Sequence, residues 1–212
     1  MPAHLSVAWL DPRRGHGAYP VLGDGPASSR AAAECQLVAS DYGPAGTVDF
    51  DVNVIASGLS IPWGLAWLPN GDMLVTERAG ALLRIAPNGE LITLAEVPIT
   101  ASGEGGLLGI AVHPDFARNR WIYLYYTSGL LGIANFNQIE RWRIADDGQS
   151  AAPDTVIVNA IPALAFHNGG RLRFGPDGKL YAGTGDAGNP LLSQLPHSPA
   201  GKILRINDDG GV

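Results

Sequence analysis

The chain has little of several features that define whole classes of protein. Cys35 is its single cysteine among 212 residues, so no intrachain disulfide can form and the redox compartment stays open. No apolar run approaches the roughly 18 residues of a membrane-spanning helix. No block of lysine and arginine occurs, and a net charge of −6 argues against nucleic acid as the main partner. We therefore expect no membrane span and no nucleic-acid partner.

The beginning of the chain also lacks a recognisable signal. Residues 1–10 show no basic segment followed by a continuous apolar stretch, so they do not read as a signal peptide. Residues 1–46 are rich in Ala, Gly, Pro and Ser without a sustained period, which is typical of a low-order N-terminal extension. We expect the structured domain to span residues 47–212.

Glycine and proline, in contrast, are plentiful. There are 28 glycines and 16 prolines, which favours many short strands over long helices. An apolar content of 46% is enough for one sizeable core. The composition therefore indicates an all-β protein.

Three segments resemble one another and begin at positions 64, 109 and 170, 45 and 61 residues apart. Each reads as strand, turn, strand, and two of the turns are Pro69-Asn70-Gly71 and Pro176-Asp177-Gly178. Repeats of this length with several strands each are typical of a β-propeller. A β-sandwich with coincidental hairpins is the alternative fold.

The number of repeats bears on completeness. Propellers typically close with about four to eight blades. Residues 47–212 supply about three blades of four-stranded antiparallel sheet, so we expect a partial propeller. Its last sheet would present an open edge, through which the chain could self-associate.

The most informative residues lie in two loops. His167 precedes one expected strand, and Asp186 follows the next. If these strands are antiparallel neighbours, both residues share one end of the sheet, and the carboxylate can orient the imidazole as a proton acceptor. Each also has a structural reading: the histidine could bond a turn carbonyl, and Asp186 could cap a turn. Glu104, set among glycines, could lie beside a ligand or be a solvated loop acid.

Several other residues are of types that often form functional sites, but their context does not indicate one. We read His113, in His-Pro-Asp-Phe, as a structural turn residue and His197 as a solvated loop residue. Gly169-Gly170 is not followed by a helix signal, so it does not predict a phosphate loop. No zinc-type Cys or His spacing and no Asp-x-Asp-x-Asp loop occurs, so we expect no metal site built from side chains.

Together, these segments resemble the soluble PQQ-dependent sugar dehydrogenases, that is, the aldose sugar dehydrogenases and glucose/sorbosone dehydrogenase-like proteins. The likeness runs from about residue 50 to 210 in one consistent order, and the aldose sugar dehydrogenase branch is the most similar. It is carried by Gly58-Leu59, Pro62-Trp63-Gly64-Leu65-Ala66, Val75-Thr76-Glu77-Arg78, Gly103-Glu104-Gly105-Gly106-Leu107-Leu108-Gly109, His113-Pro114-Asp115-Phe116, His167-Asn168-Gly169-Gly170-Arg171 and Gly201-Lys202-Ile203-Leu204-Arg205.

The resemblance implies a six-bladed propeller and a reaction. An aldose would lose the proton of its anomeric hydroxyl to a histidine while hydride passes to PQQ, and the product would be a lactone. His167 matches the catalytic base, and Asp186 matches the carboxylate that supports it. Glu104 takes the place of a cofactor-binding side chain, which is glutamine in the glucose-oxidising branch.

The resemblance also implies what is not in this sequence. In the family, later blades supply an Arg-Asn-x-Gln cluster, lysine and arginines for the PQQ carboxylates, and backbone carbonyls for calcium. The sequence stops at Val212, before such a segment, so we expect this polypeptide alone to be inactive. A non-catalytic binding propeller and an inactive incomplete product are the alternatives. Similar proteins are periplasmic or secreted, whereas residues 1–10 do not read as a signal peptide, so the localisation stays open.

Overall fold

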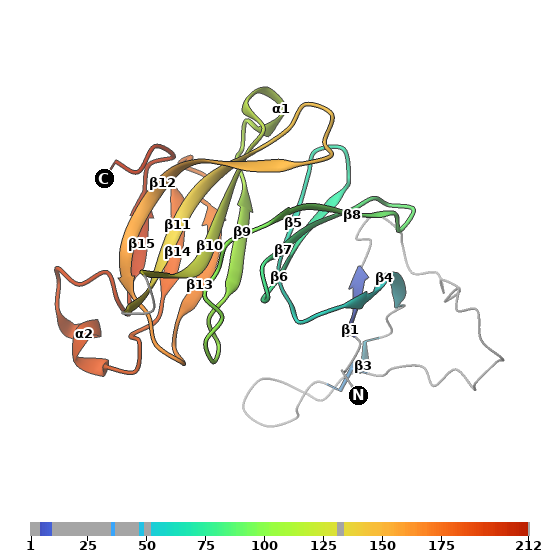
Figure 1. Ribbon diagram of the computed structural model, residues 1–212. Coiled ribbons are helices and arrows are strands. Elements are labelled where there is room, and N and C mark those ends of the chain that lie inside the picture. Colours follow the sequence, from blue (N-terminus) through green and yellow to red (C-terminus); the bar gives the residue numbers. More distant parts are fainter. Residues whose placement is uncertain (1–4, 10–34, 37–46, 49–51, 131–133, 212) are drawn as a thin grey trace. The chain divides into compact units, whose positions relative to one another are not determined.

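The computed structural model describes residues 5–9, 35–36, 47–48, 52–130 and 134–211 (Figure 1). The chain divides into two compact units, Met1–Gly58 and Leu59–Val212. The expected extension, residues 1–46, lies mostly outside the described residues, and its boundary at residue 47 stays a prediction. Among the described residues, no helix is both long and apolar enough to cross a membrane.

The first unit contains short strands. Antiparallel β2 and β3 pair Cys35 with Val48, and β1 pairs with β4, whose last residue is already in the second unit. The bounds of these strands are β1 Leu5–Trp9, β2 Cys35–Gln36, β3 Thr47–Val48 and β4 Asn53–Leu59.

The second unit consists of antiparallel sheets. The first sheet has the order β5-β6-β7-β8, the second β12-β11-β10-β9 and the third β13-β14-β15. The strands of the first sheet are β5 Pro62–Trp67, β6 Met73–Glu77, β7 Ala81–Ile85 and β8 Leu91–Glu96. Those of the second are β9 Leu107–Val112, β10 Trp121–Leu130, β11 Ala134–Ile144 and β12 Ala151–Pro162. Those of the third are β13 Gly169–Phe174, β14 Leu180–Thr184 and β15 Ile203–Ile206. The helices are α1 Phe116–Asn119 and α2 Pro190–Gln194.

The second sheet lies between the other two and is buried on both faces (Figure 1). Strand β10 shows this alternation: Ile122 and Leu124 face the core shared with the first sheet, whereas Tyr123 and Tyr125 face the core shared with the third. A strand that is buried on both faces reads as a continuous apolar run, as Trp121–Tyr126 does. The sheets therefore stack face to face, as adjacent blades do.

The innermost strands approach one another too closely for side chains. A Cβ atom at Gly109 of β9 would lie 1.8 Å from the carbonyl oxygen of Gly170 on β13. A Cβ at Gly64 of β5 would lie 2.7 Å from the Leu108 carbonyl oxygen of β9. Glycine permits this contact between backbones because it has no Cβ. The glycines of the repeated segments therefore set how closely neighbouring sheets converge.

The variant Gly109→Ala tests this role. The added methyl group meets backbone atoms, which cannot move aside as a flexible side chain can, so we expect a loss of about 1–3 kcal/mol or more in the free energy of unfolding. Gly183→Ala is the matched control, because a Cβ there meets only the Arg171 side chain at 3.9 Å. Chemical denaturation should separate the two variants, and equal stability would contradict the role given to Gly109.

The structure confirms the all-β fold and the strands expected from the repeats, and it locates β8 and β12, whose positions the sequence did not predict. β8 and β12 each lie at the edge of a sheet. The pairing of β12 with β11 shifts register at several points, and Pro153 and Pro162 lie within β12. Edge strands with bulges and prolines lose the regular alternation that sequence patterns detect. Among the described residues, the third sheet has three strands rather than four.

Candidate functional site

The pairing of β13 with β14 brings the two predicted loops together. These strands are antiparallel, and Gly169 at the start of β13 is the partner of Thr184 at the end of β14. His167 comes two residues before this pair and Asp186 two residues after it. The two side chains therefore lie at the same end of the sheet, as the sequence predicted.

His167 and Asp186 are in direct contact. The Nδ1 atom of His167 lies 2.9 Å from Oδ1 of Asp186, and the side chains are 61% and 21% exposed. An ionised carboxylate only accepts hydrogen bonds, so Nδ1 donates, and in the neutral form of the ring the lone pair is then on Nε2. The hydrogen bond from His167, together with the backbone N–H of Gly188, holds the pKa of the Asp186 carboxyl below its usual range. The pair thus presents an oriented imidazole whose Nε2 can accept a proton.

The backbone of His167 has an unusual conformation, with a φ of 58°. A residue other than glycine in this left-handed region is strained and persists only where its surroundings fix it. The backbone N–H of His167 donates to Oε2 of Glu104 at 2.8 Å, and its carbonyl accepts from Ala187 at 3.2 Å. A Cβ at Gly185 would lie 1.6 Å from the same carbonyl oxygen, so this position requires glycine. These contacts fix the backbone of His167 in place.

Glu104 lies in a second loop that contacts the first. Its backbone N–H donates to the carbonyl of Ala165 at 2.7 Å, so the two loops are joined by both the backbone and the side chain of Glu104. Arg78 donates to the carbonyl oxygens of Gly103 and Gly105 and supports this loop from the first sheet. The structure therefore brings all three predicted site residues together.

Sequence reasoning missed the residues beneath these loops. Asn168, Asn137 and Thr127 are buried and hydrogen-bonded to one another, and Tyr125 donates to the backbone carbonyl of Asn168 at 2.8 Å. Asn168 stands in the motif next to the histidine, which was a usable signal. Asn137 and Thr127 offered no such signal, because each stands next to another polar residue, Gln138 and Ser128 respectively.

The other histidines lie elsewhere. His113 is in the turn before α1, its side chain 10% exposed, with Nε2 3.3 Å from Oδ2 of Asp208. Its Nδ1 accepts from the backbone N–H of Asp115 at 2.9 Å, and Trp121 and Phe174 pack edge-on against the ring. His113 thus links the second and third sheets. His197 is exposed in the loop after α2.

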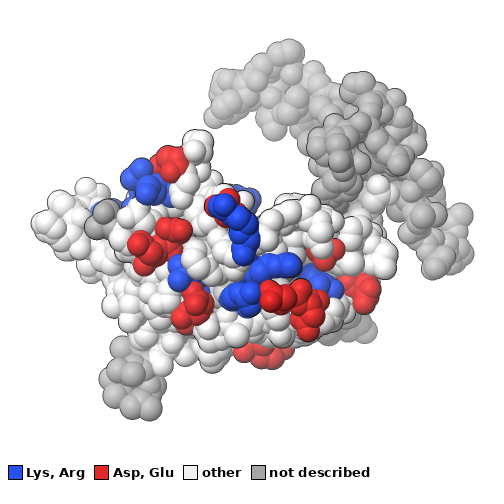
Figure 2. Space-filling model, turned by 90° about the horizontal axis from the view of Figure 1, so that it is seen from above, with Lys and Arg blue, Asp and Glu red and all other residues white. Residues whose placement is uncertain are grey.

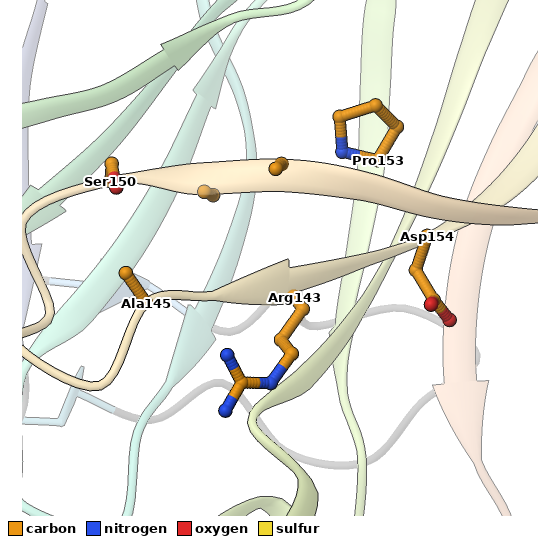
Figure 3. A pocket seen from close by; sticks show the side chains of 7 residues that line it. Arg143, Ala145, Ser150, Pro153 and Asp154 are labelled. Atoms are coloured by element: carbon orange, nitrogen blue, oxygen red, sulfur yellow. The ribbon is translucent and has the colours of Figure 1, made fainter.

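A surface cavity of about 270 Å³ lies at the end of the β11–β12 hairpin (Figure 3). β12 leads from this cavity toward the loop of His167, and its 12 residues span roughly 35 Å. Two of the residues that line the cavity, Arg143 and Asp154, pair with Asp146 and Arg141 outside it. The cavity is therefore remote from the candidate site, and its charges are already neutralised.

Charges of both signs are interspersed on the face of the molecule seen from above (Figure 2). Among the described residues, no three His, Cys, Asp or Glu side chains converge as ligands of a metal ion. Neither observation points to a site other than the one at His167.

Comparison with known proteins gives the family. The model of the glucose/sorbosone dehydrogenases matches residues 59–212, the whole of the second unit. The chain belongs to this family. The solved structure of PQQ-bound aldose sugar dehydrogenase from Streptomyces coelicolor has a TM-score of 0.68 and 45% sequence identity, over 74% of this chain and 47% of that one. The sheets are thus blades of a partial β-propeller, as the sequence predicted.

Curated relatives carry two kinds of name. Quinoprotein glucose dehydrogenase B of Acinetobacter calcoaceticus is 33% identical over 211 residues, which cover 86% of this chain and 44% of the relative. Hedgehog-interacting protein of Homo sapiens is 30% identical over 192 residues, which cover 76% of this chain and 26% of the relative. The chain therefore spans less than half the length of these relatives.

Proposed function

We propose that this chain forms the part of a quinoprotein sugar oxidoreductase that holds the catalytic base, and that the reaction oxidises an aldose to a lactone. The observation that supports this most strongly is the contact between His167 and Asp186, which leaves Nε2 free to accept a proton on the open side of the site. The names of the family members supply the substrate class, a sugar.

In this proposal, Nε2 of His167 takes the proton of the anomeric hydroxyl. The imidazole becomes positively charged as it does so, and the carboxylate of Asp186, 2.9 Å from Nδ1, stabilises that charge. Because Oε2 of Glu104 is bonded to the backbone N–H of His167, its Oε1 is the oxygen that can face the cofactor. PQQ, when bound, supplies the hydride acceptor.

The described residues fit the reacting end of such a cofactor better than its carboxylate end. Glu104 and Asp186 add negative charge to the site. Arg78, the cation that is hydrogen-bonded to the loop of Glu104, already donates to backbone carbonyls of that loop. Carboxylates need cations or N–H donors to hold them. We therefore propose that the PQQ carboxylates and the calcium ion are held by segments corresponding to the later blades of the relatives, and that this chain alone is inactive.

A chimera tests the proposed function directly. Residues 59–212 would replace the corresponding segment of the Streptomyces coelicolor enzyme, whose 45% identity favours correct assembly. After addition of PQQ and Ca²⁺, we expect an aldose to reduce an artificial dye, and we expect no reduction without PQQ. A folded chimera that binds PQQ, as its absorbance would show, but turns over no aldose would refute the proposal.

The rival function is a binding propeller without redox activity, which the likeness to hedgehog-interacting protein supports. It predicts that the folded chimera takes up no electrons from any aldose.

Self-association through the open edge of the third sheet also stays a prediction. Sedimentation of the chain over a range of concentrations would measure it.

A further inference from the structure

The loop that carries His167 is anchored by one buried polar side chain. Residues 164–167 are exposed, whereas Asn168 is 2% exposed. Nδ2 of Asn168 donates to the carbonyl of Leu164 at 2.8 Å, and Oδ1 accepts from the N–H of Leu164 at 3.3 Å. Since no side chain of residues 164–167 is buried, Asn168 is the buried anchor of this loop, beside the backbone contacts of the loop to Glu104 and Ala187.

Asn168 is held by a pair of residues on the second sheet. Thr127 of β10 and Asn137 of β11 are direct partners across the two strands and are 1% and 0% exposed. Oγ1 of Thr127 donates to Oδ1 of Asn137 at 2.8 Å, and Nδ2 of Asn137 donates to Oδ1 of Asn168 at 3.2 Å. The His167 loop is thereby fixed to the interior of the second sheet.

The same network also reaches the loop of Glu104. The backbone N–H of Gly106 donates to Oγ1 of Thr127 at 3.1 Å. One series of hydrogen bonds therefore runs from Gly106, two residues after Glu104, through the buried side chains of Thr127 and Asn137 to Asn168, the residue after His167. At the surface, the Glu104 carboxylate closes the circuit with the N–H of His167 at 2.8 Å.

The backbone fixes the direction of every bond in this series. The carbonyl of Leu164 can only accept, and the N–H of Gly106 can only donate. The amide groups of Asn168 and Asn137 can satisfy both ends in one orientation alone. A buried polar group that loses its partner costs about 1–3 kcal/mol, so the network favours one relative placement of the two loops.

We propose that Asn168, Asn137 and Thr127 are positioning residues, which hold the loops of Glu104 and His167 together so that the imidazole meets Asp186. The role of His167 as base rests on the proposed function. The test reads the geometry of the site in the chain itself and needs no turnover, so the proposal about the network and the proposal about the reaction can fail separately.

The variant Asn168→Ala is the first test, with two readouts from NMR of the whole chain. Release of the loop should raise the pKa of Asp186 toward its ordinary value of about 3.9, because His167 no longer bonds to it. Hydrogen exchange at the amide of His167 should become about tenfold faster, since loss of its bond to Glu104 corresponds to roughly 1.4 kcal/mol. Unchanged values of both in the folded variant would overturn the proposal.

A milder pair of variants decides the matter if Asn168→Ala does not fold. Thr127→Val keeps the shape of the side chain and removes the hydroxyl, whereas Thr127→Ser keeps the hydroxyl. We expect faster exchange at the amide of His167 in Thr127→Val and exchange like that of the original chain in Thr127→Ser. Equal exchange in both variants would show that the network does not position the loops.

Thr76→Val controls for a general loss of stability. Thr76 is fully buried and links the first sheet to the second, since Oγ1 accepts from the N–H of Gly64 and donates to the carbonyl of Leu108. We expect this variant to unfold more easily while the pKa of Asp186 and the exchange at His167 stay unchanged. If Thr76→Val shifted both readouts as Asn168→Ala does, the effect would be global and the proposal would fall.

Discussion

In the chimera of residues 59–212 with the Streptomyces coelicolor enzyme, His167→Gln is expected to lower kcat about 10²- to 10⁴-fold. Glutamine fills a similar volume, yet its amide cannot accept a proton at neutral pH. Asp186→Asn should have a comparable effect for a different reason. An amide that donates to Nδ1 would favour the tautomer whose proton is on Nε2, where the lone pair is needed. Dye reduction at saturating aldose measures both.

The ionisation of Asp186 determines where this residue can affect the pH dependence of turnover. The pKa of Asp186 is lowered, so its carboxylate is present above its ordinary pKa and is lost as the pH falls through the lowered value. Asp186 therefore stays ionised near neutral pH, and its titration should not change turnover there. His197→Gln is the matched control, because this exposed histidine lies outside the site. Full turnover in His167→Gln would end the assignment of the base.

Above about pH 10, the free energy of unfolding of the chain is expected to fall by up to about 4 kcal/mol per pH unit. The cause is a group of buried tyrosines on β10. Burial raises the pKa of Tyr123 to about 12, and it raises the pKa values of Tyr125 and Tyr126 as well. A raised pKa in the folded state means that the stabilisation is complete below the ordinary tyrosine pKa and is lost as the pH climbs through the raised one.

Urea denaturation in steps from pH 8 to 11 would measure this slope. Tyr125→Phe should reduce the slope by about a third, since it removes one of the three tyrosines whose loss of a proton is linked to unfolding. Leu124→Ala is the matched control on the same strand: it should lower stability by about 2–5 kcal/mol at every pH and leave the slope unchanged. A stability that did not vary across this range would contradict the burial of the tyrosines.

Local sequence signals predicted the strands of the repeated segments and the turns between them. Trp121–Tyr126 is a continuous apolar run in the middle sheet, and the turn at Pro176-Asp177-Gly178 separates β13 from β14. The positions of β8 and β12 were not predicted, because most of their side chains are not buried and the pairing of β12 contains bulges. The alternation of apolar and polar residues reveals a strand where its side chains are buried, and β8 and β12 have few buried side chains.

The sequence predicted the part of the candidate site that lies at the ends of two neighbouring strands. His167 and Asp186 flank an antiparallel pair, so the order of strands along the chain was enough to bring them to one end of a sheet. Glu104 joined them through its family resemblance, and its bond to the backbone of His167 appears only in three dimensions. The positive φ of His167 was likewise invisible, because a backbone angle at a non-glycine residue has no compositional signature.

The all-β fold, the family and the pairing of an imidazole with a carboxylate could be predicted from the sequence, because each follows from contacts between residues that are close along the chain or from motifs in order. The way the loops are held became evident only from the packing of the sheets. Asn168, Asn137 and Thr127 come from a loop and from strands of another sheet, and their hydrogen bonds depend on how the blades pack. No local rule relates polar side chains that meet only when separate sheets converge.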